Sequence, residues 1–307
     1  MLLALPQLRR LGRGEGRGIA ARTLLRRARD RARRELGRVV PRFREWEYVP
    51  EGWARERTDP AIKGWDEEAV VDAYREKLPA YAAAIAGPGP IGLPTSAAFR
   101  DAVPGVKDQN IVLGYAYALA LASRNRDTVS ILDWGGGAGL FFLLGRALLP
   151  PEVAIDYHCK DLPGLCAYGG EALPEAHFHE DDACLDRRYD LVVASSALQY
   201  GEHWRPVLGG LAGAAGSYLY LARVPVVLGS PSFVVLQRAQ RYGLGTEFLS
   251  WVFNRDELLE AASGSGLELV RELVFGERSD IHGSPEQDET RGFLFRPSGR
   301  EPVASTI

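Results

Sequence analysis

Cysteine is scarce in this chain of 307 residues, which holds only Cys159, Cys166 and Cys184. The number is odd and no two of them form a Cys-x-x-Cys pair, so we expect neither a disulfide framework nor a cysteine zinc site. The sequence also lacks an apolar run of the roughly 18 residues that a membrane-spanning helix needs. Its opening residues do not combine a charged region with a long apolar one, so they do not predict a secretory signal. Together these absences favour a reducing, cytoplasmic setting.

Lysine is missing from residues 1–44, which instead contain 14 arginines and only three acids. The whole chain has a net charge of −3, so the remainder is strongly acidic. Small and apolar residues recur at helical spacing among the arginines, at Ala21, Leu25, Ala28, Ala32, Leu36 and Val39. One interpretation is a solvated arm, and another is a basic amphipathic helix on an anionic membrane surface or a lipid-linked substrate. Nucleic acid is a third partner and is not favoured.

The segment 45–106 has a different composition, with three tryptophans followed by a helical pattern from Asp66 to about Ala86. The stretch GPGPIGLP at 87–94 then interrupts the pattern, and a second helix is expected from about Gln109 to Ser123. We interpret 45–106 as a helical extension that packs on or over the main domain.

From residue 129 onward, strand patterns alternate with helical ones. Seven strand patterns follow in order, namely VSILDW, EVAIDYHCKDL, AHFHE, YDLVVASSAL, SYLYLARV, LELVRELVF and RGFLFRP. Such alternation predicts a Rossmann-like α/β fold with a seven-stranded, mostly parallel sheet, and the last two strands are close enough in sequence to pair antiparallel. Asn254 with Glu257 three residues later predicts a capped helix over 255–263. The long interval at 225–253, after the fifth strand, is expected to be a lid or binding loop.

The turn after the first strand is rich in glycine and carries the strongest functional signal. A dinucleotide motif would need glycine at Leu140, and a phosphate-binding P-loop would need a lysine that is not there. The pattern that fits is acid-x-Gly-x-Gly-x-Gly, made by Asp133, Gly135, Gly137 and Gly139. It resembles the pattern of class I S-adenosylmethionine-dependent methyltransferases. Glycines at such a turn let a ligand approach backbone N–H groups at a helix start.

The resemblance covers residues 107–298 and implies further cofactor-binding positions. Asp161 in HCKDLPG, at the end of the second strand, corresponds to the acid that binds the ribose hydroxyls in that family. After the third strand, Asp181 or Asp182 corresponds to the acid that meets the adenine, and Asp182 is preferred. SSALQY, after the fourth strand, resembles the segment beside the methyl donor, so Gln199 and Tyr200 become site candidates.

A narrower resemblance extends over almost everything after the arginine-rich arm. YVPEGW, DQNIVLGYAYALALASR and LDWGGGAG occur in the order seen in a family of methyltransferases from bacterial surface-polysaccharide gene clusters. That resemblance implies a saccharide or other small-molecule acceptor. At the place where the family often has a histidine, this chain has Gln109, which offers no titratable nitrogen.

Transfer of a methyl group to oxygen also calls for a base within hydrogen-bond reach of the acceptor. His203, Tyr200 and His282 are the catalytic candidates, with Glu202 as a further one. Three arginines, Arg223, Arg238 and Arg241, either hold an anionic acceptor or are ordinary surface residues.

His177 and His179 would share one face of a strand, but the adenine-binding interpretation already accounts for that segment, so no metal site is predicted. A Ser-His-Asp hydrolase is not supported, since no Gly-x-Ser-x-Gly occurs. Two hypotheses remain: an active methyltransferase, and an inactive partner or regulatory subunit that binds the same donor. A nicotinamide oxidoreductase is third, because Leu140 breaks its motif. Residues 299–307 are expected to be a tail.

Overall fold

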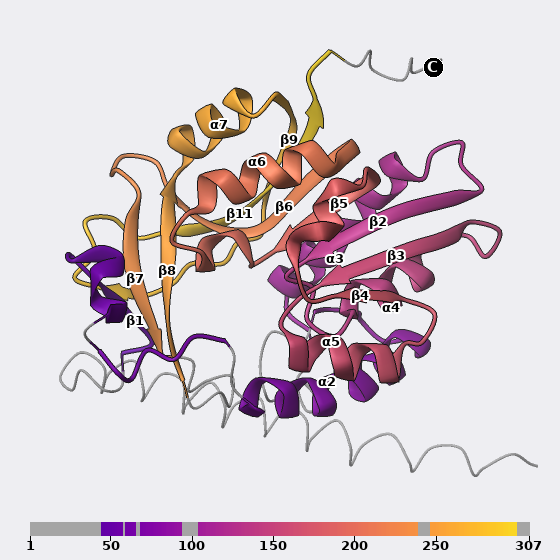
Figure 1. Ribbon diagram of the computed structural model, residues 1–307, viewed down its shortest axis with the longest axis horizontal. Helices are drawn as coiled ribbons and strands as arrows, with labels where there is room; N and C mark the ends of the chain where they lie inside the picture. The colour runs from indigo at the N-terminus through magenta and orange to yellow at the C-terminus, as the bar shows by residue number, and fades with distance from the viewer. Residues whose placement is uncertain (1–43, 58, 66–67, 94–103, 239–245, 300–307) are drawn as a thin grey trace, which may run out of the picture.

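The computed structural model describes residues 44–57, 59–65, 68–93, 104–238 and 246–299 (Figure 1). Its centre is a sheet in which seven strands lie in the order β4-β3-β2-β5-β6-β11-β9. Their bounds are Thr128–Trp134 (β2), Ala154–Lys160 (β3), His177–His179 (β4), Tyr189–Ser195 (β5), Ala215–Val227 (β6), Leu267–Val274 (β9) and Glu289–Pro297 (β11). The strands from β4 to β6 are parallel, and β11 is antiparallel to both β6 and β9. The predicted Rossmann-like sheet with an antiparallel C-terminal strand is therefore confirmed.

Four further strands enlarge this sheet to eleven. They are Trp46–Tyr48 (β1), Phe233–Arg238 (β7), Glu247–Asn254 (β8) and Ile281–His282 (β10). β8 joins the sheet where its last residues pair with the end of β6, Phe253 opposite Val226. The interval 225–253, expected to be a lid or loop, thus contains two antiparallel strands. The segment 45–106 also differs from the helical expectation, because it begins with β1, which pairs antiparallel with β7.

Helices cover both faces of the central sheet. Their bounds are Glu68–Ala86 (α2), Val106–Ala122 (α3), Leu140–Leu148 (α4), Pro163–Ala172 (α5), Trp204–Ala214 (α6) and Arg255–Gly264 (α7). Three short 3-10 helices span Gly52–Arg57 (η2), Asp182–Asp186 (η4) and Leu198–Tyr200 (η5). The helices predicted at 66–86 and 109–123 correspond to α2 and α3, although residues 66–67 lie outside the described part.

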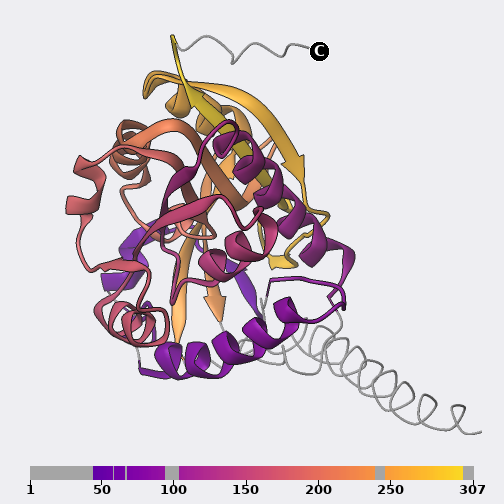
Figure 2. The same cartoon turned by 90° about the vertical axis from the view of Figure 1, so that its right-hand side faces the viewer.

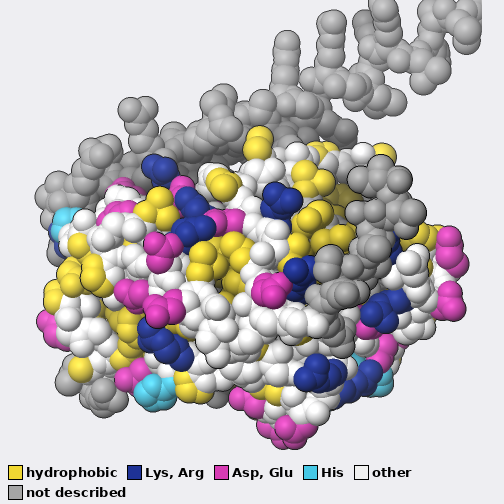
Figure 3. Space-filling model, turned by 90° about the horizontal axis from the view of Figure 1, so that it is seen from above, with side chains coloured by type: hydrophobic (Ala, Val, Ile, Leu, Met, Phe, Trp, Pro, Cys, Tyr) yellow, Lys and Arg dark blue, Asp and Glu magenta, His cyan; other side chains and the backbone are white. Residues whose placement is uncertain are grey.

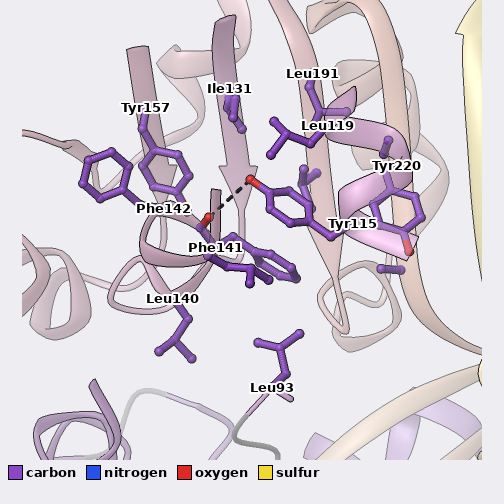
Figure 4. Packing of buried hydrophobic residues seen from close by; sticks show 14 of the residues in the cluster. Leu93, Tyr115, Leu119, Ile131, Leu140, Phe141, Phe142, Tyr157, Leu191 and Tyr220 are labelled. Atoms are coloured by element: carbon purple, nitrogen blue, oxygen red, sulfur yellow. Dashed lines mark hydrogen bonds between the residues drawn. The ribbon is translucent and has the colours of Figure 1, made fainter. Parts of the chain in front are cut away.

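Neighbouring strand residues point to opposite faces, and this alternation sorts the core into two layers. Ile131 of β2 packs with α3 and α4, whereas Leu132, the next residue, packs with α6 and α7. The first layer is joined by Tyr115 of α3, whose hydroxyl donates to the Phe141 carbonyl oxygen of α4 at 3.2 Å (Figure 4). Both residues are buried, so this bond fixes α3 against the helix that follows the glycine turn.

The start of α7 shows how the added strands are fastened to the core. The side chain of Asn254 accepts hydrogen bonds from the backbone N–H groups of Asp256 and Glu257, as its predicted capping role requires. Glu257 does not complete a capping box; its carboxylate accepts instead from the hydroxyl of Ser232 at 2.7 Å. The helix cap therefore also fixes the chain just before β7.

α2 runs lengthwise along one end of the sheet and packs against α4 and α5 (Figure 2). On the face seen in Figure 3, basic and acidic side chains are interspersed. Within the described ranges, no helix is long and apolar enough to cross a bilayer. The arginine-rich arm, apart from Arg44, lies outside the described residues, as do Arg241 and the tail beyond Gly299.

Candidate functional site at the carboxyl ends of the parallel strands

The glycine turn joins β2 to α4 at the end of the sheet where an open α/β fold binds its ligands. Gly135, Gly137 and Gly139 have φ of +74°, +63° and +85°, in the left-handed region that favours glycine. The space around the turn also leaves no room for a side chain at two of these glycines. A Cβ at Gly135 would lie 2.4 Å from the Cβ of Ala197, and one at Gly137 would lie 2.4 Å from the Tyr74 ring. The turn is therefore pressed between the loop after β5 and helix α2.

Asp161, at the end of β3, is bonded directly to this turn. Its Oδ2 accepts from the backbone N–H of Gly137 at 2.6 Å, and its Oδ1 accepts from the N–H of Leu162 at 2.8 Å. Burial raises the pKa of the Asp161 carboxyl, and these two backbone donors oppose the rise. The structure thus brings Asp161 and Gly137 together, two of the residues that the sequence predicted to bind the cofactor.

Asp133 lies beneath the turn and is fully buried. Its Oδ2 accepts from the hydroxyl of Tyr157 at 2.5 Å, while within the described part of the chain its Oδ1 has no hydrogen-bond partner. Burial raises the pKa of Asp133 to about 7. A Cβ at Gly136 would lie 2.4 Å from Oδ2, so the carboxyl supports the turn from below.

The two acids after β4 have different surroundings. Asp181 accepts from the N–H of Ala183 and begins η4, a local role. Asp182 accepts from the indole N–H of Trp134, the last residue of β2, at 3.2 Å, and its Oδ1 lies 3.3 Å from Nζ of Lys160. Asp182, the acid preferred from the sequence, is thus the one joined to the strand that carries the glycine turn, and its side chain is 59% exposed.

Two residues near the glycine turn have unusual backbone conformations, one directly after β5 and one within β6. Ser196 and Arg223, at φ +54° and +55°, are not glycines yet lie in the left-handed region. They are neighbours, since the N–H of Ser196 donates to the Ala222 carbonyl at 2.9 Å. Gln199 is buried and its Nε2 donates to the Ser196 hydroxyl and to the Arg223 carbonyl, at 3.1 and 3.3 Å. Strained backbone of this kind clusters at functional sites.

Tyr200 connects the site to the added strands. Its hydroxyl donates to Oε1 of Gln237 in β7 at 2.9 Å. Its ring meets Trp65 edge-on at 4.9 Å between centroids, and Trp65 stacks on Phe248 of β8 at 4.0 Å. Burial raises the pKa of Tyr200, so its hydroxyl keeps its proton at neutral pH.

The two predicted catalytic histidines are both exposed. His203 is the residue before α6, and its side chain is exposed and makes no capping bond. His282 is exposed on β10, which lies six strand steps from β2 in the sheet order. At about 4.8 Å per step, a side chain does not cover that separation. The structure therefore does not bring His282 to the glycine turn.

The remaining three histidines, His158, His177 and His179, stack on one another at the edge strands β3 and β4. With Asp156, His158 and His177 form a group whose ligand atoms lie within 4.8 Å of one another, close enough to hold a metal ion. Arg187 already bonds to both Asp156 and His158, so its guanidinium supplies positive charge at that point. The cluster lies at the β4 edge of the sheet, and Arg187 contacts two of its three members.

Two residues of α2 belong to the site and were missed from the sequence. The Tyr74 ring lies against Gly137, and Nζ of Lys77 lies 5.4 Å from the centroid of that ring. Burial and the nearby Arg223 lower the pKa of Lys77 to about 8. The only signal in the sequence is that both residues share the helix face of the buried Leu78 and Tyr81. A cavity of about 330 Å³ opens between α2 and α5, lined in part by Trp65, Arg75 and Tyr168.

No protein-family model and no curated protein matches this chain. Its fold is similar to that of several solved methyltransferases. One is the Burkholderia thailandensis 1,6-didemethyltoxoflavin-N1-methyltransferase, solved with S-adenosylhomocysteine, at 15% identity and a TM-score of 0.42 over 62% of this chain and 78% of that one. Magnesium protoporphyrin IX methyltransferase from Synechocystis PCC 6803 has 16% identity and a TM-score of 0.42, covering 76% and 100%. A Clostridium acetobutylicum S-adenosylmethionine-dependent methyltransferase has 9% identity and a TM-score of 0.41, covering 61% and 92%. Each likeness concerns the fold alone.

Proposed function

We propose that this protein transfers a methyl group from S-adenosylmethionine to an oxygen of a small-molecule or saccharide acceptor. The observation that carries the proposal is the bond between Gly137 and Asp161. It joins a turn of left-handed glycines to an acid on the next parallel strand, at the end of the sheet where this fold binds ligands. A glycine turn that lacks the dinucleotide spacing and is paired with such an acid fits an adenosyl ligand.

The residues present fit the donor. Asp161 is the group to accept hydrogen bonds from the ribose hydroxyls, because each of its oxygens accepts one backbone bond and has a further lone pair. Asp182 is exposed beside Trp134, where it can accept from an adenine amino group. Gly135 and Gly137 provide the left-handed backbone that the turn needs, and Gln199 has a buried amide oxygen without a partner in the described ranges. When bound, the donor supplies an electrophilic methyl group on a sulfonium ion, so the protein contributes mainly by positioning the acceptor.

Tyr200 is the best placed of the three catalytic candidates. It is the last residue of η5, next to Gln199, and its hydroxyl is protonated because burial raises its pKa. Since that proton is donated to Gln237, we assign the Tyr200 oxygen the task of orienting the acceptor by accepting a hydrogen bond from the acceptor's hydroxyl. His203 lies three residues further on with an exposed side chain, and serves as the base only if the acceptor extends to it.

The biological setting is proposed from the sequence. The order of motifs resembles methyltransferases of surface-polysaccharide gene clusters, so a lipid-linked saccharide precursor is the proposed acceptor class. The arginine-rich residues 1–44 are then the segment that meets the inner face of an anionic membrane. The proposed location is therefore the cytoplasm, peripheral to that membrane.

One observation favours the second hypothesis, a subunit that binds the donor without catalysis. None of the five histidines, all of which lie in the described part of the chain, is placed at the glycine turn. His282 is distant, His203 is exposed, and the other three stack at the sheet edge. This hypothesis expects the protein to bind the donor but to transfer no methyl group to any saccharide acceptor, either by itself or together with partners recovered in a pulldown. Methyl transfer by the protein alone would exclude it.

The first test is calorimetry with S-adenosylmethionine and S-adenosylhomocysteine, with NAD and NADP as controls. We expect micromolar affinity for both adenosyl ligands and none for the dinucleotides. If folded protein binds neither adenosyl ligand, the proposal is wrong.

A further inference from the structure

Two cationic side chains from different elements lie near the glycine turn. Arg223 comes from β6, two strands away from β2, and Lys77 comes from α2. Within the described ranges, neither side chain has a carboxylate at ion-pair distance. Elsewhere the arginines of this protein are commonly paired, as Arg255 and Arg291 are with Glu272. The lack of a counter-charge at these two positions therefore needs a physical reason.

Arg223 is held in place by its backbone. It has φ +55°, in the left-handed region that residues with a side chain rarely adopt. Its carbonyl accepts from Gln199, so the loop after β5 keeps it in that conformation. Its Nε is buried and, among the described residues, has no hydrogen-bond partner. A buried guanidinium N–H that is left unpaired costs stability unless a ligand supplies an acceptor.

Lys77 lies against Tyr74. Its Nζ lies 5.4 Å from the centroid of the Tyr74 ring, which in turn lies against Gly137. Burial, together with the charge of Arg223, lowers the pKa of Lys77 to about 8. Two partly buried cations that repel each other in this way form a site that gains from a bound anion.

We propose that Lys77 and Arg223 bind an anionic group of the methyl acceptor, a carboxylate or a phosphate, beside the glycine turn. This inference rests on the proposed function and names the acceptor's chemical class. A guanidinium matches either group with two parallel hydrogen bonds, and an ammonium adds a point charge. Arg223 lies on the Tyr200 side of the site, because its carbonyl and the Tyr200 segment are both joined to Gln199 and Ser196. That side carries the aromatic group of Trp65, Tyr200 and Phe248, which suits an acceptor.

The test uses the full-length protein with inorganic phosphate and acetate as probes, at ionic strength held constant with chloride. Thermal unfolding and calorimetry follow anion binding with and without saturating S-adenosylhomocysteine. We expect phosphate or acetate to bind in the millimolar range or tighter. Arg223→Gln and Lys77→Gln should each weaken the binding at least tenfold, and Arg223→Lys should retain part of it. Arg146→Gln on α4 is the control, because Arg146 is exposed and pairs with Glu175.

Two outcomes overturn the inference. In one, the wild type binds neither probe more tightly than chloride. In the other, Arg223→Gln weakens S-adenosylhomocysteine tenfold but leaves 5′-methylthioadenosine unchanged, which would show that the donor's own carboxylate is the bound anion. The proposed function would fail by a different result, namely the absence of adenosyl ligand binding. The two failures can be told apart because the anion titration without S-adenosylhomocysteine tests Lys77 and Arg223 independently of the donor. A variant that does not give a cooperative unfolding transition is replaced by Lys77→Met or Arg223→Met, which also remove the charge, and the same tenfold criterion applies.

Discussion

Gly137 donates its backbone N–H to the carboxylate of Asp161 at 2.6 Å, although 24 residues separate them in the chain. The bond ties the turn after β2 to the end of β3, so the two neighbouring parallel strands end in one structural unit. The carboxylate is already oriented by backbone donors before any ligand arrives. Preorientation of this kind reduces the cost of binding.

Replacing Asp161 tests that unit. Asp161→Asn keeps the shape but removes the charge and one of its two acceptor oxygens. Hydrogen bonds to a charged group contribute about 1.5–3 kcal/mol, so we expect S-adenosylhomocysteine to bind roughly 10- to 100-fold more weakly by calorimetry. Glu152→Gln, an exposed acid before β3 at the opposite end of the sheet, is the control and should leave the affinity unchanged. Equal affinities for Asp161→Asn and the wild type would remove Asp161 from the ligand site.

A methyl group at Gly137 should disturb the turn for two reasons. The residue has φ +63°, and a Cβ there would meet the Tyr74 ring at 2.4 Å. We expect Gly137→Ala to lower the free energy of unfolding by about 1–3 kcal/mol, as measured by urea denaturation, and to weaken S-adenosylhomocysteine binding.

Gly201→Ala is the matched control. Gly201 has φ −104°, and a Cβ there would meet no atom within 4 Å. Its unfolding free energy should stay within about 0.5 kcal/mol of the wild type. If both alanine variants lose the same unfolding free energy, the close contact between Gly137 and the Tyr74 ring is not the reason for the loss.

The central sheet and the glycine turn were predictable because their signals are local. A strand that is buried on both faces, such as β5, appears in the sequence as a continuous apolar run. A turn whose residues have positive φ favours glycine at those same positions, so a few neighbouring residues are enough to indicate it. Asp161 could be found in the same way, since the end of the next strand fixes its position. Asp182 was preferred over Asp181 by resemblance alone; its contact with Trp134 depends on the pairing of three strands.

The parts that escaped prediction depend on distant contacts. β7 pairs with β1 about 190 residues earlier in the chain, and nothing local distinguishes its apolar run from a loop that covers a site. Tyr74 and Lys77 lie on a helix that the sequence predicted, but only its docking across the strand ends brings them to Gly137. His282 was proposed from a polar segment, and its distance from β2 is a property of the sheet order.

The bond between Tyr200 and Gln237 should be a measurable link between the site and β7. Tyr200→Phe keeps the ring but removes the hydroxyl that donates at 2.9 Å, so we expect a loss of about 1 kcal/mol in unfolding free energy. In a double-mutant cycle with Gln237→Leu, the two losses should not add, with a coupling of about 0.5–1.5 kcal/mol. Simple additivity would show that the two side chains do not interact in solution. Affinity for S-adenosylhomocysteine should change less than twofold in Tyr200→Phe, because the hydroxyl is assigned to the acceptor.

The buried carboxyl of Asp133 makes a pH-dependent contribution to stability. Burial raises its pKa from the ordinary value near 3.8 to about 7, so between these two values the folded protein holds a proton that the unfolded chain has lost. The contribution of Asp133 is therefore greatest below about pH 4, declines as the pH rises towards 7, and is constant above that. A shift of about three units in the pKa of Asp133 corresponds to roughly 4 kcal/mol of unfolding free energy at most.

Asp133→Asn cannot ionise and can still accept from Tyr157, so the difference in unfolding free energy between variant and wild type should move in favour of the variant between pH 5 and pH 8. Urea denaturation of both proteins at several pH values between 5 and 8 measures this difference. The contributions of other carboxyls, such as Glu272, cancel in the difference because both proteins contain them. A difference that does not change with pH would mean that the Asp133 carboxyl does not titrate in this range.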